Sequence, residues 1–207
     1  MNNTLYAPIA GPVGYVVDMV KMLGFHYANP HSYTKYRQIV AVAKRTHARV
    51  LIETGTYRGV TTRRCLPHFN RVFTIELDRS LAQAAQQSLA RYAKCEVIEG
   101  DAAKEVPKLC ERSDIGSDIL FFLDGHFSGG DTALGEQTEP ALDIIHAIAK
   151  RKERMAAMIV DDFREFGTRS GWPAKSQLVH AIEHSFPAKT FDLVVHMDQV
   201  LVMRRVP

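Results

Sequence analysis

The amino-acid sequence predicts an α/β fold of three layers, built on a doubly wound, mostly parallel sheet of seven strands with a C-terminal antiparallel hairpin. Two observations lead to this prediction. Short, continuously apolar runs alternate with amphipathic helical segments, which is typical of parallel strands covered by helices on both faces. The last two apolar runs, 191–197 and 200–203, are separated by only two residues, which indicates a hairpin.

The expected elements alternate along the chain. Strands are predicted where β-branched and aromatic residues cluster, at 49–53, 72–76, 95–99, 119–124 and 155–160. Apolar residues at helical spacing predict helices over 33–46, 79–92, 102–110 and 139–152. Prolines and glycines punctuate the start of the chain. We therefore expect a loop-rich N-terminal arm over 1–32, with one short helix at 15–23, followed by a single domain over 33–207.

The composition is that of an ordinary globular protein and excludes several classes. With 207 residues, 46% of them hydrophobic and 24% charged, the chain can bury a large core and is too apolar to be disordered. The net charge is +3 and the basic residues are scattered among acids, so no nucleic-acid partner is indicated. No apolar run approaches the ~20 residues that span a membrane. Three cysteines without a CxxC pair suit a reducing cytoplasm.

Acidic residues stand at or just after the ends of the first four expected strands: Glu53, Glu76, Asp101 and Asp124. In an open parallel sheet, ligands bind at the carboxyl ends of the strands, in the crevice where the strand order reverses. Packing explains such acids poorly, because an unpaired buried carboxylate is costly. The pattern therefore indicates a ligand site along this edge.

The turn after the first strand, Glu53-x-Gly55-x-x-x-Gly59, fits a methyl donor. Its glycines let the backbone approach a ligand, and the helix beyond them offers free N–H groups to a carboxylate. S-adenosylmethionine carries such a carboxylate and an ammonium that Glu53 can offset. A nicotinamide dinucleotide would require G-x-G-x-x-G, of which only Gly55 and Gly59 are present.

Two further acids match other parts of the donor. Glu76 is placed to accept from both ribose hydroxyls, and Asp101 from the adenine amino group. Thr56, Ala102 and Asp124 adjoin these groups and complete the expected donor site.

Four segments resemble the successive signature segments of class I S-adenosylmethionine-dependent methyltransferases, in order and in spacing. They are 50–59, 73–78, 97–101 and 120–124, and the resemblance covers roughly 49–205. It implies the class I methyltransferase fold, an enzyme that uses S-adenosylmethionine, and donor contacts from Glu53, Gly55, Gly59, Glu76 and Asp101.

A metal site is a second hypothesis. Asp124, Asp161 and Asp162 follow two strands that should be neighbours, and three carboxylates suit Mg²⁺. The ion would lower the pKa of an acceptor hydroxyl beside the methyl group. The three residues resemble the ligands of metal-dependent O-methyltransferases of the catechol and macrolide-sugar types.

The geometry of a strand sets a condition on this metal site. Neighbouring residues in a strand point to opposite faces, so Asp161 and Asp162 can both bind one ion only if the chain turns at Asp161. Otherwise Asp162 caps the next helix or turn, and Asp124 lines the donor pocket.

The loop after Asp124 supplies a candidate general base, His126, whose ordinary pKa suits proton removal near neutrality. We thus expect Asp124 and His126 to be catalytic, in Mg²⁺-assisted O-methylation of a small hydroxylated acceptor. Two alternatives stay open: a metal-independent N- or O-methyltransferase that uses His126, and a non-catalytic nucleoside-binding module. The expected partner is the small-molecule acceptor, without nucleic acid or membrane. Whether the chain forms a homo-oligomer is left open.

Overall fold

The central sheet has the strand order β3-β2-β1-β4-β5-β7-β6 within residues 7–24, 26, 29–125 and 139–205, which the computed structural model describes. Its strands are β1 (Val50–Thr54), β2 (Arg71–Glu76), β3 (Cys95–Glu99), β4 (Ile119–Leu123), β5 (Met155–Val160), β6 (Phe191–His196) and β7 (Gln199–Arg204). The strands β1 to β5 pair in parallel, whereas β7 is antiparallel to both β5 and β6. The predicted parallel sheet and its C-terminal hairpin are confirmed.

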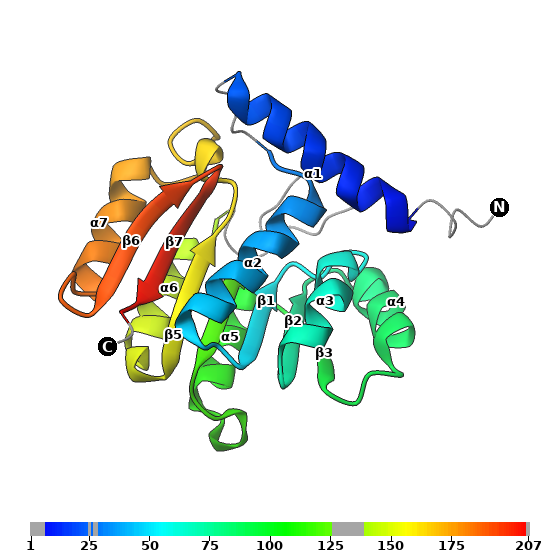
Figure 1. Cartoon of the computed structure of the whole chain (residues 1–207). Coiled ribbons are helices and arrows are strands. Elements are labelled where there is room, and N and C mark those ends of the chain that lie inside the picture. The colour runs from blue at the N-terminus through cyan, green and yellow to red at the C-terminus, as the bar shows by residue number, and fades with distance from the viewer. Residues whose placement is uncertain (1–6, 25, 27–28, 126–138, 206–207) are drawn as a thin grey trace.

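Helices cover both faces of the sheet (Figure 1). They are α1 (Ala7–Leu23), α2 (Ser32–Thr46), α3 (Val60–Cys65), α4 (Arg79–Leu89), α5 (Ala102–Glu111), α6 (Ala141–Ala149) and α7 (Lys175–Ser185). Short 3-10 turns are η2 (Leu66–His68), η3 (Ser113–Ile115), η4 (Lys152–Arg154) and η5 (Phe163–Glu165). In the described ranges, no helix combines the length and the apolar character that a membrane crossing requires.

The central strands β1, β4 and β5 are buried along their whole length because both of their faces pack against helices. In β4, Phe121 and Leu123 join the cluster formed with α5, α6 and α7, whereas Leu120 and Phe122 join the cluster formed with α2, α3 and η2. All five residues of β4 are buried. This double burial explains why the sequence shows continuous apolar runs rather than alternation.

The N-terminal helix α1 is longer than the sequence indicated. It begins at Ala7, where a loop was expected, and not at Tyr15. Two of the glycines that indicated a loop serve helix packing instead. A Cβ on Gly11 would come 2.6 Å from Tyr33, and one on Gly14 would come 3.0 Å from His31. Small residues here allow α1 to lie against the start of α2.

A buried carboxylate in α1 fixes this packing. Asp18 accepts hydrogen bonds from the backbone N–H of His31, at 2.8 Å, and from the hydroxyl of Thr34. It also contacts the His31 ring at 2.7 Å. Because His31 and Thr34 stand at the beginning of α2, Asp18 binds α1 to the helix that follows it. In Figure 1, α1 lies across the edge where the parallel strands end.

Candidate functional site

The strand order reverses between β1 and β4, and the loops that leave these two strands touch. Gly55 adopts φ +83°, and a Cβ there would come 2.6 Å from the carbonyl oxygen of Asp124. The hydroxyl of Thr54 accepts the backbone N–H groups of Asp124 and Gly125, at 3.2 and 3.1 Å. Two expected site residues, Gly55 and Asp124, are therefore neighbours at the point where open α/β sheets bind ligands.

The loop between β1 and α3 is shaped by its backbone. Gly59, with φ +64°, precedes α3, and its N–H donates to the carbonyl of Thr56 at 2.8 Å. Thr56 is buried, and its hydroxyl pairs with the Thr74 hydroxyl at 2.7 Å. Tyr57 has φ +48° and an exposed side chain. The loop thus presents Tyr57 to solvent and holds Thr56 against β2.

Glu76 connects the end of β2 to this loop. One carboxylate oxygen accepts the N–H of Tyr57 at 2.7 Å, and the other accepts the N–H of Asp78 at 3.0 Å. A carboxylate oxygen can accept a further hydrogen bond beyond these. Glu76 is therefore held by the backbone in one orientation and still has capacity to accept hydroxyl groups.

Asp101 has a structural role that the sequence reasoning did not assign. It is the N-cap of α5, and its carboxylate accepts the N–H of Ala103 at 2.9 Å. Ala102 is the first residue of that helix. The sequence could have indicated this cap, because Asp101 immediately precedes the predicted helix and aspartate is a preferred N-cap residue.

Glu53 lies beneath the loop, with 1% of its surface exposed. One of its oxygens accepts the hydroxyls of Thr62, at 2.5 Å, and Thr74, at 2.9 Å. Burial raises the pKa of Glu53 to about 7 despite these two hydrogen bonds, and the negative charge of Glu76 adds to the rise. Neither threonine partner was identified from the sequence.

The centre of the acceptor side is an ion-pair cluster that the sequence reasoning missed. Asp161 is fully buried, and Lys35 from α2 forms an ion pair with its Oδ2. The Lys35 Nζ also lies 3.2 Å from Asp124 Oδ1 and 3.4 Å from Asp124 Oδ2. The Nε2 of Gln199 donates to the other Asp161 oxygen at 3.0 Å. Lys35 therefore lies at the position where a bound cation was expected.

The charges of this cluster depend on one another. Burial, together with the charge of Asp161, raises the pKa of Asp124 well above its usual range. Burial also acts to raise the pKa of Asp161. The positive charge of Lys35 and the hydrogen bonds from Asp124, Lys35 and Gln199 outweigh burial, so the pKa of Asp161 is lowered. Burial opposes the charge of Lys35, yet the negative charges of Asp124, Asp161 and Asp162 raise its pKa. The arrangement therefore pairs an ionised Asp161 with a protonated Lys35.

Asp162 does not join this cluster. It adopts φ +52°, so the chain turns at Asp162, while Asp161 still donates its N–H to Leu123 at 3.0 Å. The Asp162 carboxylate accepts from the Arg164 guanidinium at 2.9 Å. In the described ranges, no three His, Cys, Asp or Glu side chains gather as a metal site requires. The three carboxylates expected as metal ligands thus lie in two groups, Asp124 and Asp161 at Lys35 and Asp162 at Arg164, because the chain turns at Asp162 and not at Asp161.

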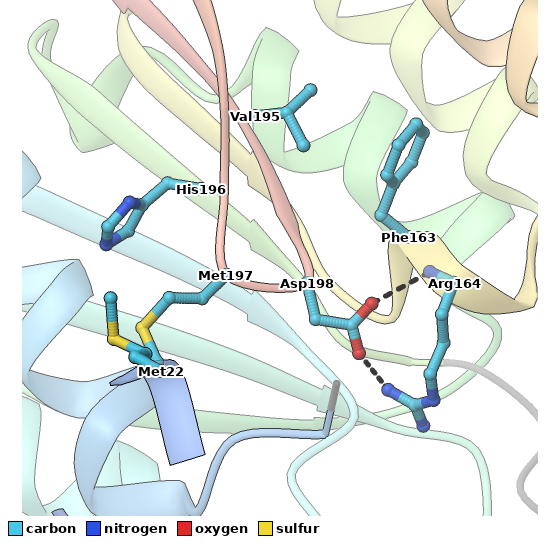
Figure 2. A pocket seen from close by; sticks show the side chains of 7 residues that line it. All are labelled: Met22, Phe163, Arg164, Val195, His196, Met197 and Asp198. Atoms are coloured by element: carbon cyan, nitrogen blue, oxygen red, sulfur yellow. Dashed lines mark hydrogen bonds and ion pairs between the residues drawn. The ribbon is translucent and has the colours of Figure 1, made fainter. Parts of the chain in front are cut away.

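A hollow of about 420 Å³ lies beside the end of β5 (Figure 2). It is lined by Met22, Phe163, Arg164, Val195, His196, Met197 and Asp198. Asp198 accepts the N–H of Arg164 at 2.8 Å and pairs with its guanidinium. The backbone N–H of Asn29 donates to the same carboxylate at 3.0 Å. The hollow is thus bounded by α1, η5 and the β6–β7 turn. His126, the expected base, falls outside the described residues.

The strand order, the parallel β1 to β5 and the antiparallel β6–β7 pair constitute the class I methyltransferase fold. No family model matches the sequence, and no curated protein matches it significantly.

Solved structures share the fold at low sequence identity. The O-methyltransferase TomG from Streptomyces achromogenes, involved in tomaymycin synthesis and determined in complex with S-adenosylmethionine, is 18% identical; the match covers 84% of this chain and 81% of TomG, with a TM-score of 0.56. The Podospora anserina methyltransferase PaMTH1 is 13% identical over 83% of this chain and 78% of its own, with a TM-score of 0.55. The N-methyltransferase NodS from Bradyrhizobium japonicum WM9 is 14% identical. The match covers 86% of this chain and 98% of NodS, with a TM-score of 0.55.

Proposed function

We propose that this protein is an S-adenosylmethionine-dependent methyltransferase. The observation that carries the proposal is the contact between the loops after β1 and β4, with Glu76 bonded to the first of these loops. A loop held between Asp124 and Glu76 at the switch point of the sheet supports a donor site there. The similar fold of TomG, determined with S-adenosylmethionine bound, adds support.

Each expected donor residue has a definite part in this proposal. Glu76 accepts the two ribose hydroxyls with the lone pairs that its backbone partners leave. Asp101 accepts from the adenine amino group, and Ala102 lies beneath the ring. Gly55, Thr56 and Gly59 shape the loop that contacts the methionine part. Glu53 offsets the donor ammonium from below this loop, because its burial strengthens a charge interaction.

The proposed reaction is methylation of a hydroxyl group on a small acceptor. The acceptor oxygen forms a bond to the methyl carbon, and the bond from sulfur to that carbon breaks with its electron pair remaining on sulfur. The hydroxyl proton passes to a base, for which we propose His126, two residues beyond Asp124. The products are the methylated acceptor and S-adenosylhomocysteine. The hollow in Figure 2, with apolar side chains beside Arg164, His196 and Asp198, supports a small organic acceptor that also carries polar groups.

Calorimetry with S-adenosylmethionine and with S-adenosylhomocysteine tests the donor site. We expect the wild-type protein to bind both compounds at one site. NADH serves as the competing ligand, because a dinucleotide was the rival interpretation of the glycine turn. Absence of binding by either adenosyl compound, or tighter binding of NADH, would overturn the proposal.

The sequence also led us to expect assistance by Mg²⁺, and the residues as they lie do not fit a bound ion. An ion held by Asp124, Asp161 and Asp162 would have to displace Lys35 and separate Asp162 from Arg164. This observation favours the alternative of a metal-independent methyltransferase.

A further inference from the structure

We infer that the Lys35 ammonium takes the place of a divalent metal, so that the acceptor side of this site carries its own cation. The inference rests on the proposed methyl transfer for the role of Lys35 toward the acceptor. Its claim about metal binding stands on the geometry alone.

A metal ion at Asp161 would have to compete with polar groups that already contact both of its oxygens. Asp161 would be the central ligand of a metal ion, but both of its oxygens have partners. Oδ1 accepts from Gln199 Nε2 at 3.0 Å, and Oδ2 is paired with Lys35. Since Asp161 has no exposed surface, it cannot turn a free oxygen toward an ion without rearrangement.

The charge of Lys35 also disfavours a metal ion here. A divalent ion between Asp124 and Asp161 would lie beside the Lys35 ammonium, and like charges repel strongly at such a distance in a partly buried site. If the ion displaced Lys35 from Asp161, it would be the new counter-ion of the carboxylate, but the largely buried Lys35 ammonium would lose its own, which is a costly state. The cluster is therefore stable with one cation, and that cation is covalently part of α2.

The cluster is open to solvent on the side of Lys35 and Asp124. The Asp161 side chain is 0% exposed, whereas the Lys35 and Asp124 side chains are 13% and 24% exposed. An acceptor therefore meets Lys35 and Asp124, with Asp161 behind them. An ammonium has three N–H donors, and the two carboxylates take only some of them.

Lys35 can consequently donate to the acceptor oxygen. As that oxygen loses its proton, negative charge develops on it, and a fixed ammonium at hydrogen-bond distance stabilises this charge. Lys35 lies in the first turn of α2, so the position of the cation is set by a helix that Asp18 anchors. A metal ion would supply the same electrostatic effect.

Binding of Mn²⁺, followed by electron paramagnetic resonance without S-adenosylmethionine, tests the inference directly. We expect no bound Mn²⁺ in the wild type or in Lys44→Ala, which removes an exposed lysine from the same helix. Specific uptake of one ion by the wild type, lost in Asp161→Asn, would overturn the inference. Because no donor is present, this result is independent of whether the protein transfers methyl groups.

Kinetics test the role toward the acceptor once a methylated acceptor has been found. We expect Lys35→Met to lower kcat by at least about 100-fold, the effect of removing a preorganised charge donor, with donor affinity unchanged. The double variant Lys35→Met/Asp161→Asn removes both charges of the pair. It leaves no unpaired buried charge that could prevent folding. Activity of either folded variant close to that of Lys44→Ala would overturn this role, as would loss of wild-type activity in EDTA.

Discussion

Gly55 and Asp124 are in backbone contact across the point where the strand order reverses, so that a Cβ on Gly55 would lie 2.6 Å from the Asp124 carbonyl oxygen. The backbone at Gly55 also has φ +83°, which side chains rarely adopt. We predict that Gly55→Ala lowers the free energy of unfolding through both effects. The left-handed backbone costs about 1–2 kcal/mol, and the clash adds about 1–3 kcal/mol.

Gly116 provides the matched control. It has φ +72°, and within the described part of the chain no atom lies within 4 Å of the place that a Cβ would take there. Its ψ of −168° lies in a region that is almost restricted to glycine, so Gly116→Ala should show only a backbone cost, of about 1–3 kcal/mol, in urea unfolding. Equal destabilisation of the two variants would mean that the two loops can separate without cost.

The donor role of Glu76 predicts a loss of affinity. Glu76→Ala removes the acceptor of two ribose hydroxyl groups, which should weaken binding of S-adenosylhomocysteine by about 2 kcal/mol in calorimetry. Glu99→Ala is the control, since Glu99 ends the neighbouring strand with a side chain that is 43% exposed. Similar affinities in the two variants would refute the ribose contact.

Glu53 predicts a pH dependence of stability. Its pKa in the folded protein is about 7, above the ordinary 4.5, so the folded state holds the proton more tightly than the unfolded state. This contribution to stability is fully present below pH 4.5 and is lost as the pH rises to about 7. The loss should be on the order of 3 kcal/mol.

Urea unfolding of wild type and Glu53→Gln, over the range from about pH 4.5 to about pH 7, isolates this effect. The glutamine variant cannot ionise, so its stability should fall less over the same range. Parallel curves for the two proteins would show that Glu53 does not titrate there.

The Lys35–Asp161 pair predicts a large stability effect of a small change. Asp161→Asn leaves the shape of the side chain but removes the charge that faces Lys35. Breaking one partner of a buried ion pair costs about 3–5 kcal/mol. Asp192→Asn, which breaks partly exposed pairs with Arg45 and Arg205, should cost at most about 1 kcal/mol. Thermal and urea unfolding measure the loss of stability in both variants. An equally small loss in Asp161→Asn and Asp192→Asn would show that Lys35 does not stabilise Asp161.

The sheet could be predicted from the sequence because double burial makes the central parallel strands, such as β4 and β5, continuous apolar runs. The strands at 95–99 and 155–160 have the predicted bounds. The start of α1 could not be predicted in this way. Glycines in its sequence indicated a loop, whereas Gly11 and Gly14 occur there because α2 approaches closely. That reason lies in tertiary packing and leaves no local signal.

The candidate site could be predicted only in part. Acids at strand ends pointed to the switch point, where Gly55 and Asp124 do meet. Lys35 was missed because its carboxylate partner Asp124 is 89 residues away. A signal was nevertheless present: Lys35 stands four residues before the buried Ile39, on the face of α2 that turns toward the sheet.

The origin of Lys35 in α2 has a consequence for biosynthesis. The ammonium emerges from the ribosome before the first strand, whereas Asp124 and Asp161 follow the fourth and fifth strands. N-terminal parts of a chain begin to fold during synthesis, so α1 and α2 can pack together while Lys35 still has no carboxylate beside it. The cluster closes only after β5 is translated and has paired with β4. Nascent chains that end before Asp161 would therefore contain most of the parallel strands, but the ion-pair cluster around Lys35 could not yet form.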